Sequence, residues 1–151
     1  MNLPRLKRLL DHCRQRPGLK HFDFNVIAKS HPCGTAGCLL GEMAYCWPDR
    51  FKLVMACSTV PIGALVPIGT DHATIRHYKW ETVVERAIRL AAAWFEIDYL
   101  DARWLFMPNE TYRTHPNLPD SNLKTDSTLE DVLLNLESYI KRHDPAKSPR
   151  S

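Results

Sequence analysis

The 151-residue sequence has no long apolar run, no dense run of one charge and no regular spacing of cysteines. No stretch approaches the roughly 20 apolar residues that a membrane-spanning helix needs. Its five cysteines are an odd number, which argues against the disulfide framework of a small secreted protein. The first residues, MNLPRLKRLLDHC, lack the apolar segment and cleavage site of a secretory signal. We therefore expect a cytoplasmic protein without a membrane partner.

The sequence also has little that indicates catalysis or nucleic-acid binding. A net charge of +3 is too small to predict the Lys/Arg stripe of a nucleic-acid-binding surface. Paired carboxylates, a Ser/His/Asp order and a CxxC pair are all missing. These absences leave catalysis open but favour a protein that is not an enzyme and has no cofactor or resident metal.

Hydrophobic periodicity predicts a mainly α, single compact multi-helix domain. Hydrophobic residues make up 44% and charged residues 25%, which are ordinary values for a soluble domain. Apolar residues recur at helical spacing in several segments, with the basic residues of the first facing solvent. The expected helices cover 3–13, 36–47, 81–96, 98–106 and 129–140. We expect one domain over residues 1–142 and a disordered polar tail over 143–151.

The segments between these helices give weaker signals. Asp49 is placed to cap a short helical turn over 51–56. The segment 57–79 is apolar but interrupted by proline and glycine, which excludes a long helix and allows a small β-hairpin or an ordered loop. Residues 109–126 are polar with two prolines and predict a surface loop.

The most specific stretch is HPCGTAGCLLGEMAYC, residues 31–46, which holds three of the five cysteines. Gly34 allows a sharp turn and Thr35 is a good helix N-cap, so we expect a helix to begin at Ala36. Apolar or small residues occupy almost every side of this helix. That distribution predicts a buried central helix.

This part of the chain resembles a family of small, mostly uncharacterised proteins of bacteria, phages and prophages. The family has F-D-x followed by C-G-T-x-x-C-x-x-G, and here 22–24 and 33–41 match that order. Two departures are Glu42, where members usually have Trp, and a longer insertion over 57–79. The resemblance implies an intracellular, often phage-linked helical protein and supplies no catalytic residues.

The start of the central helix is the leading candidate for a ligand site. A helix N-terminus presents free N–H groups and a partial positive charge, which suit phosphate or carboxylate. His31 lies nearby and offers a proton-dependent charge. The residues assigned to this anion site are Gly34, Thr35, Ala36, Gly37 and Cys38.

Three other interpretations of the motif stay open. Its glycines and cysteines can serve packing alone, because cysteine is a small apolar filler and glycine lets helices approach closely. His31, Cys33, Cys38 and Cys46 offer nitrogen and sulfur ligands for zinc, at a spacing unlike that of a standard zinc knuckle. Cys38 also lies where a helix start activates a thiol, with His31 or His12 as the base.

Two further features are candidates for function. Glu42 is a carboxylate on an otherwise uncharged helix, so we expect an Arg or His partner or a place in a cavity wall. The 72–80 segment gathers polar and aromatic residues before a helix, and is either an ordinary surface loop or a ligand rim that stacks a base and binds phosphate. Its candidate binding residues are His72, Arg76, His77, Tyr78 and Trp80.

Together these features predict a non-enzymatic binding protein of phage or prophage type. It would hold a small anionic ligand, such as a nucleotide, at the start of the central helix with help from the 72–80 segment, and so sequester a host signalling molecule. The alternative is a protein-interaction or inhibitor module that acts on a host protein, with the motif purely structural. The sequence leaves the oligomeric state open.

Overall fold

The computed structural model describes residues 1–15, 28–31, 34–37, 39–55, 63–75, 77–78, 80–106 and 129–146. Helices dominate this part of the chain, and its strands form two small antiparallel sheets, β1–β2 and β3–β4. The predicted fold class, a mainly α compact domain with a small hairpin, is confirmed. The predicted loop over 109–126 lies outside the described residues. So does the whole 22–24 match to the family motif.

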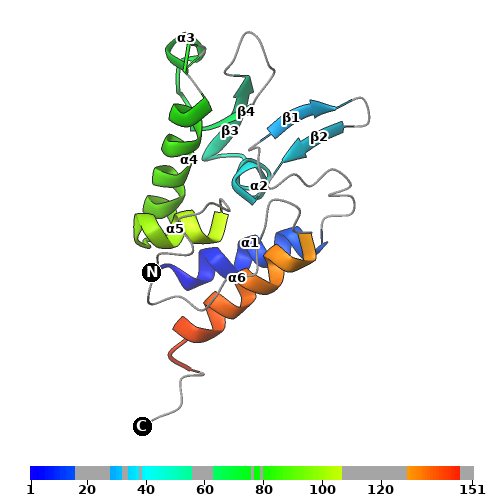
Figure 1. Ribbon diagram of the computed structural model, residues 1–151, viewed down its shortest axis with the longest axis vertical. Coiled ribbons are helices and arrows are strands. Elements are labelled where there is room, and N and C mark those ends of the chain that lie inside the picture. The colour runs from blue at the N-terminus through cyan, green and yellow to red at the C-terminus, as the bar shows by residue number, and fades with distance from the viewer. Residues whose placement is uncertain are drawn as a thin grey trace.

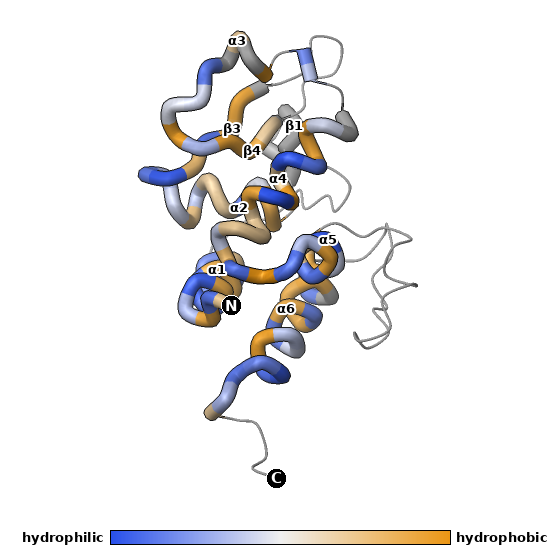
Figure 2. The backbone as a smooth tube through the Cα atoms, turned by 90° about the vertical axis from the view of Figure 1, so that its left-hand side faces the viewer, coloured by the Kyte–Doolittle hydropathy of each residue, from blue (hydrophilic) through white to orange (hydrophobic). Residues whose placement is uncertain are grey.

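The lower layer of the molecule is built from α1 (Leu3–Gln15) and α6 (Leu129–His143), which lie against each other in Figure 1. Both helices are amphipathic, as predicted, and Figure 2 shows apolar and polar residues alternating along each of them. The apolar side of α1 is buried against α2 and α6. Its buried residues are Leu6, Leu9, Leu10 and Cys13.

The central helix α2 (Leu39–Cys46) is almost wholly buried, as the sequence predicts, but the expected start at Ala36 is wrong. Residues Gly34–Gly37 form strand β2 instead, which pairs antiparallel with β1 (Ala28–His31). Thr35 lies opposite Ser30 in this ladder. Two of the four residues are glycines, each of which costs about 1 kcal/mol in a helix interior, and the strand is held by its pairing with β1.

A second hairpin covers one side of α2. Strand β3 (Phe51–Met55) pairs with β4 (Gly63–Pro67), with Leu53 opposite Leu65. The helical turn predicted over 51–56 is therefore wrong, because cross-strand pairing outweighs the local cap that Asp49 offers. The hairpin expected within 57–79 exists, but its first strand starts earlier in the chain.

Helix α4 (Trp80–Phe95) confirms the helix predicted over 81–96. The residue after its end, Glu96, has a φ of 54° in the left-handed region, and the Ile97 N–H donates to the Ala92 carbonyl at 3.0 Å, which closes the helix end. The next helix, α5 (Tyr99–Phe106), follows directly after Asp98. Before α4 there is one short helix, α3 (His72–Ile75).

Ordered structure continues past residue 142, where the sequence places the start of a disordered tail. Helix α6 runs to His143, and the following Asp144 is buried. Its carboxylate accepts a hydrogen bond from Lys7 Nζ at 2.9 Å. This ion pair holds the end of α6 against α1, while residues 147–151 lie outside the described part.

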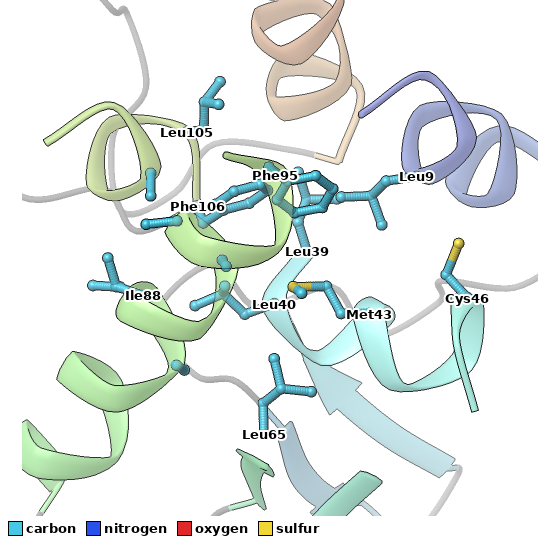
Figure 3. Close-up of a cluster of buried hydrophobic side chains, with 14 of the residues drawn as sticks. Leu9, Leu39, Leu40, Met43, Cys46, Leu65, Ile88, Phe95, Leu105 and Phe106 are labelled. Atoms are coloured by element: carbon cyan, nitrogen blue, oxygen red, sulfur yellow. The ribbon is translucent and has the colours of Figure 1, made fainter. Parts of the chain in front are cut away.

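The core is formed where α2, α4 and α5 meet (Figure 3). Phe95 and Phe106 stack with their ring centroids 5.4 Å apart, and both are fully buried. Leu39 and Leu40, the first residues of α2, are also fully buried. Trp104 is buried, whereas Trp94 is only partly buried.

Candidate functional site

A groove of about 970 Å³ lies between β4, α3 and the outer side of α4. Its volume is at the upper end of the range for small-molecule sites, about 300–1,000 Å³. In Figure 1, α4 runs beside the β3–β4 hairpin, and α3 lies above the upper end of α4. The apolar part of the lining consists of Leu65, Val66, Pro67, Ile75, Leu90 and Ala93.

Polar side chains form the other part of the groove, mostly from α4. Arg86 places its guanidinium carbon 4.7 Å from the ring centroid of Tyr78, which fixes the arginine by a cation–π contact. Arg89 lies three residues further along α4 and also lines the groove. The groove therefore combines an apolar floor with two guanidinium groups.

Glu85 is the acidic side chain among the residues that line this groove, and its charge is already engaged. Its carboxylate accepts a hydrogen bond from the Tyr99 hydroxyl and another from Arg89 Nε at 2.9 Å. The Tyr99 hydrogen bond, together with Arg89, lowers the pKa of Glu85 below its ordinary value. Burial, and then the hydrogen bond to Glu85, raises the pKa of Tyr99. At neutral pH the pair is thus a carboxylate held by a neutral phenol.

Of the residues predicted as a ligand rim in the 72–80 segment, Tyr78 lines this groove, and His77 is exposed beside Tyr78. His72 begins α3 and Trp80 begins α4, while Arg76 lies outside the described residues. The groove-lining residues of α4 (Thr82, Glu85, Arg86 and Arg89) were not predicted as site residues from the sequence. The sequence signal that could have found them is the four-residue spacing of Glu85 and Arg89 on the polar side of the helix.

The motif residues occupy a different place. His31 lies in β1, and Gly34, Thr35, Ala36 and Gly37 form β2, so they are not the first turn of a helix. The first turn of α2 begins instead with fully buried leucines. Cys38 and Cys33 lie outside the described residues.

Glu42 has the histidine partner that its position predicts. The carboxylate is buried at 5% exposure, and its Oε2 lies 3.0 Å from His12 Nε2 on α1. The contact joins α1 to α2 inside the molecule. The sequence suggests His12 only as a base for a thiol, so its contact with Glu42 is a finding of the structure.

Cys13 and Cys46 are buried thiols. Burial raises the pKa of the Cys46 thiol, against the opposing effect of Arg8, so Cys46 is not activated. Within the described ranges no three His, Cys, Asp or Glu side chains gather as metal ligands would. The zinc and thiol hypotheses that involve Cys33 and Cys38 concern residues outside those ranges and stay predictions.

Comparison with protein-family models, with curated proteins and with solved structures finds no match to this chain. The family resemblance drawn from the motif thus stays a prediction. Among the described helices, none is long and apolar enough to cross a membrane.

Proposed function

We propose that this protein binds a small anionic ligand with an apolar or aromatic part, such as a nucleotide, in the groove between α4 and β4. The observation that carries the proposal is the groove itself, which sets two arginines beside an apolar floor of ligand-sized dimensions. Guanidinium groups suit phosphate and carboxylate because their N–H donors match two oxygens at once. The apolar floor would cover the uncharged part of the same ligand.

The location differs from the one that the motif suggested. An anion site at the start of the central helix needs free backbone N–H groups at Ala36, Gly37 and Cys38. Ala36 and Gly37 belong to a β-ladder, and α2 begins with Leu39 and Leu40 in the core. The 72–80 segment and α4 therefore support ligand binding better than the motif does.

Binding without catalysis is favoured by the state of the titratable groups in the groove. A general acid needs a pKa near neutrality, whereas the hydrogen bond from Tyr99 moves that of Glu85 downward. The same pairing raises the pKa of Tyr99, so its proton stays on the hydroxyl. Sequestration of a phage-relevant nucleotide remains the biological role that the family resemblance suggests.

A thermal-shift screen with mono-, di- and cyclic nucleotides tests this proposal. A nucleotide at about ten times its Kd should raise the Tm by roughly 3–6 °C, because it binds only the folded chain. Arg86→Gln should reduce this rise. Arg142→Gln is the matched control, since Arg142 is also an exposed arginine stacked on an aromatic ring, 5.8 Å from Trp104 and away from the groove.

The proposal fails if no nucleotide in the panel raises the Tm, or if both arginine variants reduce the rise equally. Failure would favour the second candidate, a module that binds a host protein. That candidate has one supporting observation: Leu134, on the last helix, leaves 49% of its surface exposed. Single exposed apolar residues are common on soluble proteins, so this candidate stands second.

A further inference from the structure

A second hollow, of about 400 Å³, lies where α1 passes the ends of α2 and α4. Arg5 and Arg8 enter it from α1, and Arg50 enters it from the turn after α2. Trp47 and Trp94 form its aromatic part. Among the described residues, the lining of this hollow and that of the groove of the proposed function have no member in common.

Two of the three arginines are held in place before any ligand arrives. Arg5 Nη1 donates to the Trp94 carbonyl at 2.7 Å, and its guanidinium carbon lies 3.7 Å from the Trp94 ring centroid. Arg8 Nη2 donates to the Cys46 carbonyl at 3.0 Å, and the Arg8 guanidinium carbon lies 5.4 Å from the Trp47 ring centroid. Each guanidinium has five N–H donors, so each keeps several for another acceptor. Such preorganised side chains lose little conformational entropy when they bind an anion.

The charge of this hollow is positive. Its three guanidinium groups face one carboxylate, Asp49, which is 78% exposed and lies 3.8 Å from Arg50. The ends of α2 and α4 each add about half a negative charge through their carbonyls. The sum leaves about one positive charge for an incoming anion.

The aromatic rings of the hollow already pack against other side chains, which limits the ligand to a compact group. Trp94 contacts Arg5, and its ring packs at steep angles against Phe51 and Trp47 with centroids 5.1 and 5.4 Å away. Trp47 packs in the same manner against Phe95. The recognised feature is therefore the anion and not a ring stacked on tryptophan.

We propose that this arginine hollow is a second anion site, which binds a phosphate group through Arg5, Arg8 and Arg50. Free phosphate and the phosphate of a monoester carry the same tetrahedral oxygens, which the guanidinium donors fit. The site does not depend on the proposed function, because it lies on different residues.

Titration with inorganic phosphate and, separately, with phosphoserine tests the site, using tryptophan fluorescence at constant ionic strength. Both should give a saturable change, since Trp47 and Trp94 line the hollow, and sodium chloride should not. Tighter binding of phosphoserine would identify a monoester ligand, and tighter binding of phosphate would identify the free anion. Arg50→Gln should weaken binding about tenfold, the loss of one charge-assisted hydrogen bond. Asp49→Asn should strengthen it.

Arg142→Gln is the matched control. Arg142 is an exposed arginine that also stacks on a tryptophan, with its guanidinium carbon 5.8 Å from the Trp104 ring centroid, and it lies on α6, away from the hollow. Its loss should leave phosphate binding unchanged. The proposal is overturned if phosphate gives no saturable change, or if Arg142→Gln weakens binding as much as Arg50→Gln. Because Arg50 lies on the surface, its substitution leaves the fold intact.

Discussion

At the scale of single residues, a buried carboxylate is costly unless a partner compensates for the lost hydration. Glu42 is such a group, and His12 supplies a hydrogen-bonding partner across the α1–α2 contact. The need for a partner follows from local chemistry alone. It could be predicted as an Arg or His contact, whereas the identity of His12 depends on how α1 crosses α2 and could not.

His12→Ala should lower the free energy of unfolding by about 1–3 kcal/mol, because a buried carboxylate loses a hydrogen-bond partner. Urea denaturation at neutral pH measures the change. His77→Ala is the control, since His77 is exposed, and it should change stability by less than about 0.5 kcal/mol. Equal losses from the two substitutions would show that the His12–Glu42 contact contributes nothing. Pairing His12→Ala with Glu42→Gln in a double-mutant cycle isolates the contact itself.

Arginines also illustrate what residue types alone leave undecided. The sequence predicts that the basic residues of α1 form a solvated surface, and Arg8 is indeed exposed while Arg5 is partly buried. Both also bind a carbonyl at the end of another helix and stack on a tryptophan. An arginine that faces only solvent and one that binds a neighbouring helix can have the same spacing along their own helix. Only the neighbouring helices distinguish the two cases.

At the scale of elements, the helices were predictable where a broad apolar face persists over several turns, as in α4 and α6. The errors fell on short segments. Gly34–Gly37 and Phe51–Met55 have local signals for a helix cap or turn, yet both form strands because partner strands are present. The pairing of Phe51 with Pro67 joins residues far apart on the scale of a helical turn, and the β1–β2 pairing depends on a partner strand, so cap and turn signals at single residues reveal neither.

One hydroxyl joins two of these helices and gives the fold a dependence on alkaline pH. Tyr139 on α6 is fully buried and donates to Asp101 on α5 at 2.7 Å. Burial, and then this hydrogen bond, raises the pKa of Tyr139 well above its ordinary value. The folded chain therefore holds the proton more tightly than the unfolded chain. This stabilisation is complete below the unfolded pKa of about 10 and is lost as the pH rises above it.

Unfolding free energies measured from about pH 8 to about pH 11 test this dependence. Wild type should lose stability steeply above about pH 10, and Tyr139→Phe should lose less. At neutral pH the same variant should be less stable by about 0.5–1.5 kcal/mol, the value of one hydrogen bond. Tyr45→Phe, at a 45% exposed tyrosine, should keep the wild-type slope. A Tyr139→Phe slope equal to that of wild type would contradict the assignment.

At the scale of the whole molecule, the candidate site depends on how three consecutive elements of the chain pack against one another. The groove needs β4, α3 and α4 together, and its arginines come from the exposed side of a helix whose opposite side is core. Tyr78 could be predicted as a site residue because aromatic and basic residues cluster around it. Arg86 and Arg89 could not, since an exposed arginine on an amphipathic helix is ordinary until a hairpin lies beside it.

Backbone NMR with the same nucleotide panel tests the central claim, that the α4–β4 groove is the ligand site. Nucleotide addition should shift the amide signals of Leu65 and Val66 on β4 and of Arg86 and Arg89 on α4, which line the groove. Signals from α6, on the far side of the core, should stay in place. Shifts that gather at residues 34–41 instead, or that are absent throughout, would contradict the claim.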